Sequence, residues 1–249
     1  MTFSLCCTLP NVYAIDTKSI ISDKLDWFAA MIEEEVIFKT SRGLRLSGVL
    51  LAPDGEQLRD VVIFAHGTGS NKNSPRNRGI AERLLNADIA SFLFDFTGHG
   101  ASDGIFEQST QDQQFDDLIS ALDFIDKQTF VQTRFIGVNG SSTGATVTIR
   151  AAAEDPRIQV IVLRVPRNFG IMQYVPLVRA PTLIIQGSED LVVLPEAQEI
   201  YEALTCPKEF HLVQGAGHLF EEKPEFLQEM TEATCEWFIK WFEYIGKTE

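Results

Sequence analysis

The sequence is poor in cysteine and in basic residues. Its four cysteines, Cys6, Cys7, Cys206 and Cys235, have neither the spacing of metal ligands nor the density of a disulfide scaffold, so we expect buried or incidental thiols in a reducing compartment. Lys and Arg number 21 against 35 Asp and Glu, which gives a formal net charge of -14 at pH 7. No Lys/Arg cluster offsets this charge locally, and it repels phosphate backbones and anionic headgroups. The composition therefore argues against nucleic acid as a partner, and the acidity is interpreted as a contribution to solubility.

Long apolar runs are absent as well. No stretch approaches the roughly 20 apolar residues that a membrane helix needs, so we expect no membrane span. The first 15 residues end in a small-residue pattern similar to a cleavage site. They contain no Lys or Arg before Lys18, however, and they include Pro10 and Asn11, which argues against a secretory signal peptide. The prediction is a cytoplasmic protein.

No repeat, low-complexity segment or Gly/Ser-rich linker divides the chain, and a hydrophobic fraction of 45% suffices for one large core. We predict a single domain over residues 34–249, preceded by an N-terminal extension, residues 1–33. In the extension, "SIISDKLDWFAAMIEE" can form an amphipathic helix with Ile21, Leu25 and Phe28 on one face. Docking on the domain is the default role of this helix. Pairing with a second subunit in a homodimer and overhanging the active site stay open.

Strand patterns alternate with helical patterns along the chain. The expected strands are residues 35–40, 44–53, 61–66, 90–96, 134–139, 159–165, 181–187 and 209–215. The first two are joined by the hairpin signal "SRG" and should pair antiparallel at one edge. From the third strand on, apolar residues at 3.6-residue spacing follow each strand, as in Phe115, Leu118, Leu122 and Ile125. The alternation predicts an α/β fold: an eight-stranded, mostly parallel sheet with an antiparallel first hairpin and helices on both faces.

Two serines stand side by side in "NGSSTGA", where the fifth strand turns into a helix. Ligands of open α/β sheets sit beyond the carboxyl ends of the strands, so this turn is a candidate site. A sharp turn that raises a nucleophile brings the flanking backbones close together, and the positions two before and two after it must then be small. For Ser142 those positions are Gly140 and Gly144, whereas for Ser141 they are Asn139 and Thr143. The pattern therefore predicts Ser142 as the nucleophile.

A serine hydroxyl needs a base, and the chain offers four histidines. His66 ends the third strand and His211 lies inside the last one, which makes both poor candidates. His99, flanked by glycines in "DFTGHGASDG", is interpreted mainly as a support of its loop. His218 follows the last strand in "VQGAGHLFEE", where a base from the far side of the sheet would arrive, so we predict that it is the base.

The acid that orients the base should precede it, at the end of an intervening strand. "PTLIIQGSEDLVV" supplies Glu189 and Asp190, and Asp190 is preferred because the loop then leaves Glu189 facing solvent. Two backbone N–H groups should bind the oxyanion of acyl transfer. We predict Thr143 at the helix start and Thr68 in "HGTGS", with Gly69 as the alternative to Thr68.

The motifs "HGTGS", "DFTGHGASDG", "GSSTG", "GSEDLVV" and "GAGH", in this order over residues 35–245, resemble the α/β-hydrolase superfamily. More narrowly, the chain is similar to the dienelactone-hydrolase-like and small serine acyl-esterase branch, which includes feruloyl and cinnamoyl esterases. The resemblance implies a serine hydrolase that cleaves a carboxylic ester of a small or aromatic acyl group, with no metal or organic cofactor. Dienelactone hydrolases use a cysteine nucleophile, and serine at position 142 favours ester hydrolysis instead.

Many members of the superfamily carry a cap domain after the sixth strand. Here residues 166–180 leave room for a short loop or a single helical turn, which predicts a shallow, open pocket for a small-molecule ester. The candidate substrate contacts are Gly67, Gly69, Phe169 and Met172, with Ile171 and Tyr174 nearby. Four arginines, Arg76, Arg78, Arg164 and Arg167, would recognise an anionic substrate group if they converged at the rim, but solvated or ion-paired arginines are the favoured interpretation.

Two alternatives to an esterase stay open. Peptidases, thioesterases and acyltransferases use the same three residues and differ in leaving group and acceptor. A non-catalytic ligand-binding protein can also be built on this fold, because a fold does not determine function. The intact Ser, Asp and His set argues against this second alternative.

Overall fold

The computed structural model of the chain describes residues 31–55, 57–128 and 132–248. Within these residues, eight strands form one sheet in the order β1-β2-β4-β3-β5-β6-β7-β8. The strands are β1 (Met31–Lys39), β2 (Arg45–Pro53), β3 (Leu58–Ala65), β4 (Ala90–Phe94), β5 (Gln132–Ser141), β6 (Ile158–Arg164), β7 (Thr182–Gly187) and β8 (Lys208–Val213). The N-terminal extension expected at residues 1–33 falls almost entirely on residues 1–30, which lie outside the described residues.

Strand direction places all candidate catalytic loops at one edge of the sheet. β2 pairs antiparallel with β4, whereas β4, β3, β5, β6, β7 and β8 run parallel to one another. This mixed sheet confirms the predicted fold class. The inner strands are continuous apolar runs, such as Val61–Ala65 of β3, because both faces of a parallel sheet are covered by helices. The loops that follow β3 to β8 therefore meet at the carboxyl edge.

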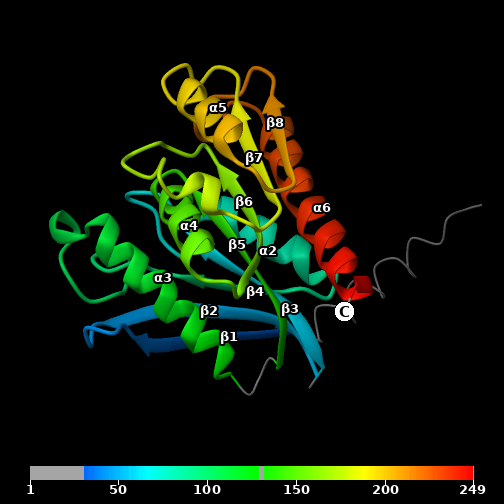
Figure 1. Cartoon of the computed structure of the whole chain (residues 1–249). Coiled ribbons are helices and arrows are strands. Elements are labelled where there is room, and N and C mark those ends of the chain that lie inside the picture. The colour runs from blue at the N-terminus through cyan, green and yellow to red at the C-terminus, as the bar shows by residue number, and fades with distance from the viewer. Residues whose placement is uncertain (1–30, 56, 129–131, 249) are drawn as a thin grey trace, which may run out of the picture. The chain divides into compact units, whose positions relative to one another are not determined.

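Helices cover both faces of the sheet (Figure 1). α2 (Pro75–Leu85) and α6 (Pro224–Thr248) pack together on one face, and α3 (Gln111–Asp126), α4 (Thr143–Glu154) and α5 (Leu194–Ala203) cover the other. Leu118, Leu122 and Ile125 of α3 are buried, as their spacing predicts. Two short 3-10 helices, η1 (Phe106–Gln108) and η2 (Val175–Leu177), lie in the connecting loops. No helix of the described residues is both long enough and apolar enough to cross a membrane.

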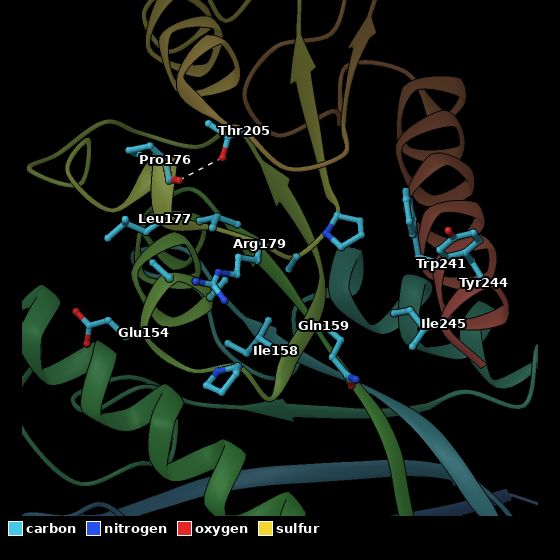
Figure 2. A pocket seen from close by; sticks show the side chains of 16 residues that line it. Glu154, Ile158, Gln159, Pro176, Leu177, Arg179, Thr205, Trp241, Tyr244 and Ile245 are labelled. Carbon is cyan, nitrogen blue, oxygen red and sulfur yellow. Dashed lines mark hydrogen bonds between the residues drawn. The ribbon is translucent and has the colours of Figure 1, made fainter. Parts of the chain in front are cut away.

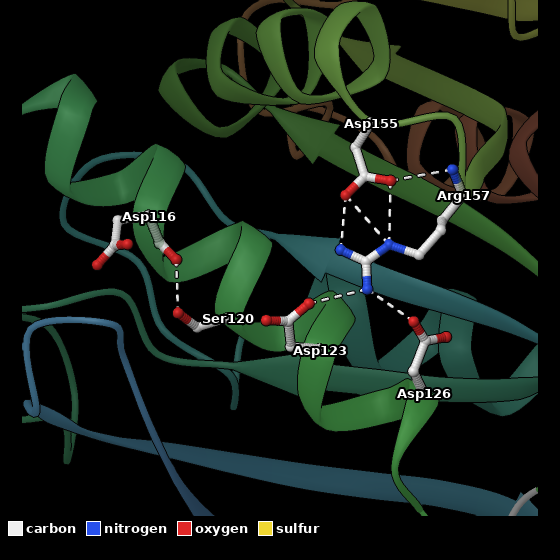
Figure 3. Close-up of polar contacts among 6 residues, drawn as sticks. All are labelled: Asp116, Ser120, Asp123, Asp126, Asp155 and Arg157. Carbon is white, nitrogen blue, oxygen red and sulfur yellow. Dashed lines mark hydrogen bonds and ion pairs between the residues drawn. The ribbon is translucent and has the colours of Figure 1, made fainter.

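One arginine joins the ends of α3 and α4 just before β6 begins (Figure 3). The Arg157 guanidinium contacts Asp123 and Asp126 of α3 at 2.8 and 2.6 Å, and Asp155, which follows α4, at 2.6 Å. The hydrogen bonds that Arg157 donates to Asp155 are the main reason why the pKa of Arg157 is raised. This cluster fixes the edge of the sheet opposite to the candidate catalytic loops.

His66, the first residue after β3, is buried and neutral. Its Nε2 accepts the Phe96 N–H at 3.1 Å, so the proton is on Nδ1, which donates to the Gly67 carbonyl oxygen at 2.8 Å. Burial lowers the pKa of His66 from 6.5 to about 4. The neutral imidazole of His66 thus joins the loop after β3 to the loop after β4.

Acid should weaken the fold through this histidine. Between pH 6.5 and about 4 the unfolded chain protonates His66 and the folded chain does not, so the free energy of unfolding should fall as the pH is lowered through that window. The contribution of His66 is on the order of 3 kcal/mol. Urea unfolding of the wild type and of His66→Gln at pH 7 and pH 4.5 measures it, because the variant should lack this part of the pH dependence. Equal pH dependence of the two proteins would contradict the prediction.

Candidate active site

Ser142 lies at the turn between β5 and α4 with a backbone conformation that non-glycine residues rarely adopt. Its φ and ψ are 52° and -117°, and its N–H donates to the Arg164 carbonyl oxygen of β6 at 2.9 Å. Such strain persists when the surroundings impose it, and it is common at functional sites. Ser141, by contrast, is the last residue of β5 and pairs in register with Arg164. The structure thus places Ser142 at the tip of the turn.

The glycines on either side of Ser142 occupy positions where a side chain does not fit. A Cβ at Gly140 would lie 2.6 Å from the Ala145 Cα, and a Cβ at Gly144 would collide with the carbonyl oxygens of Ala65 and His66. The turn therefore packs directly on the end of β3. This close approach is the one expected from the sequence for a turn centred on Ser142.

Asp190 and His218 are brought together from the loops after β7 and β8. His218 Nδ1 donates to Asp190 Oδ2 at 2.6 Å, and the Asp190 side chain is buried. The bond leaves Nε2 as the nitrogen available to a nucleophile, and within the described residues Nε2 has no hydrogen-bond partner. Glu189 instead accepts from the Ser188 hydroxyl on the exposed side of the loop. Of the two acids considered, Asp190 is the one that holds the imidazole.

No hydrogen bond joins Ser142 to His218 among the described residues, and in unliganded sites this contact is often long. Ser142 follows β5 and His218 follows β8, at the same edge of the sheet.

The other two histidines have different partners. His99 is buried and its Nδ1 donates to the Thr97 carbonyl oxygen at 3.1 Å, whereas His211 bonds Glu229 of α6 at 2.9 Å.

Gln186 is a polar neighbour of the acid that the sequence argument missed. It is fully buried in β7, and its Nε2 donates to Asp190 Oδ2 and to the Gly187 carbonyl oxygen, both at 3.3 Å. The donor stabilises the carboxylate in the orientation that receives the imidazole. The available signal was a glutamine inside the otherwise apolar strand "TLIIQG".

The two residues predicted to bind the oxyanion, Thr68 and Thr143, are in direct contact. Their hydroxyl oxygens are 3.0 Å apart, although one follows β3 and the other begins α4. A Cβ at Gly67 would lie 3.3 Å from the Ser142 Cβ, so the "HGTGS" loop lies against the turn. Thr143 is the first residue of its helix, where an N–H has no intrahelical acceptor, and within the described residues the Thr68 N–H donates no hydrogen bond. Both N–H groups are thus free to bind an anion.

Asp95 joins the loop after β4 to the loop that carries Thr68. Its carboxylate accepts the Lys72 N–H at 2.6 Å and the Ala101 N–H at 2.9 Å. A Cβ at Gly100, whose φ is 50°, would collide with this carboxylate. These contacts give "DFTGHGASDG" a structural role, since they hold the "HGTGS" loop against the end of β5.

The four arginines do not form a common anion site. Three of them have carboxylate partners: Arg76 pairs with Glu221, Arg78 with Glu33 and Arg167 with Glu196. Arg164 is fully buried and donates to the Asn77 side chain, and burial, with Arg76 nearby, lowers its pKa to about 9. Arg164 is therefore still charged at pH 7, but it is enclosed between β6, α2 and α6.

The predicted substrate contacts differ in exposure. Phe169 is exposed and lies under the Arg167 guanidinium at 4.3 Å, whereas Met172 packs partly buried against the core. Gly69 has a φ of 71° and open space where a Cβ would be, and Gly67 lies against Ser142. The segment after β6 holds only the three-residue η2 as regular structure, so the minimal cap is confirmed.

A cavity of about 790 Å³ lies far from these loops (Figure 2). It is lined at the amino-terminal ends of β6 and β7 by residues such as Ile158 and Pro181, together with Trp241 of α6. Thr205 and Pro176, joined by a hydrogen bond of 3.2 Å, form part of its wall. Because the strands are parallel, this cavity is at the edge opposite to Ser142 and is not the candidate active site.

Comparisons with known proteins agree with the fold of this chain. Residues 56–177 match the family described as serine aminopeptidase, S33 (Hydrolase_4). A crystal structure of dienelactone hydrolase from Anabaena variabilis is 31% identical, with a TM-score of 0.76, and the match covers 85% of this chain and 99% of that one. Est1E from Butyrivibrio proteoclasticus, solved with ferulic acid, has a TM-score of 0.75 at 20% identity, covers 84% and 99% of the two chains, and shows the fold alone.

A curated relative is longer than this chain. The putative phosphoribosyl transferase Rv0571c of Mycobacterium tuberculosis is 34% identical over 216 residues, which are 84% of this chain and 46% of the relative. The chain thus spans about half the length of the curated relatives that it matches first. With these matches, the sheet order and the Ser142 turn, the chain belongs to the α/β-hydrolase superfamily. Within that superfamily it resembles the dienelactone hydrolase of Anabaena variabilis over nearly the whole of that protein.

Proposed function

We propose that this chain is a serine hydrolase that cleaves a carboxylic ester through an acyl-enzyme on Ser142. The observation that carries the proposal is the 2.6 Å bond between His218 Nδ1 and Asp190 Oδ2 at the sheet edge where Ser142 occupies a strained turn. A carboxylate that holds an imidazole in one tautomer, beside a raised serine, is the arrangement that activates a hydroxyl for acyl transfer.

Each residue has a defined step in the proposed reaction. His218 Nε2 takes the proton of the Ser142 hydroxyl as its oxygen attacks the ester carbonyl carbon, and the N–H groups of Thr68 and Thr143 bind the resulting oxyanion. When the intermediate collapses, the C–O bond to the alcohol breaks and His218 returns the proton to the leaving oxygen. Water, deprotonated by His218, then attacks the acyl-enzyme. The C–O bond to Ser142 breaks, His218 gives the proton to the Ser142 oxygen, and the acid is released. Asp190 stays ionised and orients the imidazole throughout.

A small or aromatic acyl group is the substrate class that the site supports best. The short segment after β6 leaves the site open, with Phe169 exposed at its side. The names of similar proteins point the same way, since one is a dienelactone hydrolase and another was solved with ferulic acid. The matching family is described as serine aminopeptidase, so amide cleavage is the second candidate.

The remaining proposals concern the chain as a whole. The boundary expected at residue 34 falls inside β1 (Met31–Lys39), so we place the catalytic domain at residues 31–249, with the residues before it as an extension, and we place the protein in the cytoplasm. Cys206 and Cys235, the two cysteines among the described residues, are both free thiols, as a reducing compartment favours.

A fluorophosphonate probe tests the proposed function. We expect the wild-type protein to be labelled on the peptide that contains Ser142, and we expect turnover of nitrophenyl esters to exceed turnover of the matching anilides. A panel that varies acyl length and aromaticity then defines the acyl group. Failure of the wild type to react with the probe would favour the non-catalytic ligand-binding alternative, and faster cleavage of anilides would favour a peptidase.

A further inference from the structure

Large apolar side chains are exposed around the candidate active site. Six of them lie in loops at the carboxyl edge of the sheet, and we call them the apolar collar: Ile105, Phe106, Phe169, Leu191, Val192 and Leu219. Leu191 and Val192 are each 71% exposed, and the other four are 45 to 55% exposed. Single exposed apolar residues are ordinary, but a group of them around a site indicates a contact surface.

Four members of the collar are held together beside the acid and the base. Leu191 and Val192 directly follow Asp190, and Leu219 directly follows His218, so the bond between Asp190 and His218 keeps the two loops in contact. Phe169 adjoins them because the Asn168 N–H donates at 3.0 Å to Glu196, in the first turn of α5 just after Val192.

The other two members lie on the opposite side of Ser142. Ile105 and Phe106 belong to the loop after β4, and the Phe106 ring packs on the ring of His99 at 4.9 Å between centroids. His99 in turn packs on His66, the first residue of the "HGTGS" loop. Since β4 and β6 to β8 are on opposite sides of β5, the collar flanks the nucleophile from both directions.

We propose that the apolar collar docks this hydrolase on the surface of an uncharged or zwitterionic lipid aggregate, so that it cleaves esters presented at the lipid–water interface. This inference rests on the proposed function for its catalytic part. The collar points outward around the site, and the three-residue η2 provides no cap that could enclose an acyl chain away from water. A neutral interface contacts all of these loops at once and needs no hydrogen bonds from them.

Charge selects a neutral surface over an anionic one. Within the described residues, three carboxylates of the collar loops, Glu107, Glu189 and Glu222, have no ion-pair partner. The loop of Leu219 also carries one cation without an ion-pair partner there, Lys223, which lies 5.3 Å from the centre of the Phe226 ring, so the unpaired charges of these loops are mainly negative. The chain as a whole carries a formal net charge of -14. Anionic lipid headgroups and acidic carrier proteins are therefore repelled, whereas phosphatidylcholine or a neutral glyceride is not.

The test combines vesicle flotation with two ester substrates. We compare the wild type, the double variant Leu191→Ser/Val192→Ser, and the control Leu58→Ser, which is 60% exposed but lies at the start of β3, at the opposite edge. Flotation uses vesicles of phosphatidylcholine alone and of phosphatidylcholine mixed with phosphatidylglycerol. Hydrolysis is measured on nitrophenyl acetate in solution and on the cinnamate ester of a long-chain alcohol, which keeps a small aromatic acyl group, dissolved in the phosphatidylcholine vesicles.

We expect the wild type to float with phosphatidylcholine vesicles, and to float less once phosphatidylglycerol is added. The double variant should lose about tenfold or more in vesicle binding and in the rate on the vesicle-borne ester, because two large apolar side chains no longer enter the interface. Its kcat/KM on nitrophenyl acetate should stay within about twofold of the wild type, and Leu58→Ser should match the wild type in every measurement.

Three results would overturn the proposal. The first is a wild-type protein that does not float with phosphatidylcholine vesicles, and the second is a double variant that loses activity equally on the soluble and the vesicle-borne ester. The third is sedimentation that shows two copies of the chain joined through the collar. Flotation does not depend on catalysis. A wild type that binds vesicles but hydrolyses neither ester would therefore refute the proposed function and leave the docking surface standing.

Discussion

Replacing Ser142 by alanine should lower kcat for a soluble nitrophenyl ester by roughly 10⁴- to 10⁶-fold, which is the range found when the nucleophile of a serine hydrolase is removed. The variant lacks the oxygen that forms the acyl-enzyme, while the N–H groups of Thr68 and Thr143 still bind an oxyanion. A small residual rate over water should therefore persist. The measurement is a steady-state assay together with labelling by a fluorophosphonate probe. We expect no labelling of the variant.

Ser141→Ala is the matched control, because the two serines are adjacent and chemically identical. Ser141 belongs to β5 and has an ordinary strand conformation, whereas Ser142 has a φ of 52° at the tip of the turn. We expect Ser141→Ala to keep kcat within about threefold of the wild type, as is usual for a substitution that touches neither the core nor the reacting atoms. If Ser141→Ala abolished labelling while Ser142→Ala retained it, the assignment of the nucleophile would be wrong.

The parts of the site that follow from local sterics and chain order could be predicted from the sequence. Gly140 and Gly144 identify Ser142 because small residues are needed two positions away on each side, and this is a local condition. Asp190 and His218 follow from the rule that parallel strands end at one edge, so that each loop can be assigned to its strand. The bond between them is consistent with that reasoning, although the catalytic roles stay predictions.

Contacts between distant elements could not be predicted in the same way. The 3.6-residue spacing of Phe226, Met230, Ala233, Trp237 and Trp241 predicts one buried face of α6. Phe226 and Trp241 are only partly buried, however, and Phe238 and Phe242 fill the core instead. The reason is Gly137 of β5, where a Cβ would lie 2.6 Å from the Phe238 ring, so the missing side chain makes room for these rings. Periodicity within one helix does not contain that information.

Exposure is the other property that the sequence does not reveal. "LVV" after Asp190 has the composition of a buried segment, yet Leu191 and Val192 are exposed and only Val193 enters the core. Arg164 is the converse case, since a charged residue at the end of a strand suggests the surface and this one is fully buried. Both exceptions lie at the carboxyl edge of the sheet. Residues at functional sites often depart from the burial that their residue type favours.

Gly144→Ala should destabilise the protein by about 2 to 4 kcal/mol, even though alanine is the better helix former. Gly144 is the second residue of α4, and its new Cβ would collide with the carbonyl oxygens of Ala65 and His66. These are backbone atoms of β3 and of the "HGTGS" loop, so relief requires moving either the helix or the loop. The free energy of unfolding in urea measures the loss of stability. Since displacements of about 1 Å in a reacting group can cost about 100-fold in rate, kcat should fall as well.

Gly79→Ala supplies the comparison that separates this collision from the general effect of changing glycine in a helix. Gly79 lies within α2, and a Cβ there would meet no atom within 4 Å. The substitution should therefore raise the free energy of unfolding by about 0.5 to 1 kcal/mol, because alanine loses less backbone entropy on folding. The same chemical change should thus have opposite signs at the two positions. A stabilising Gly144→Ala would mean that α4 does not pack on the end of β3. The close packing of this turn could then no longer explain the strained backbone conformation of Ser142.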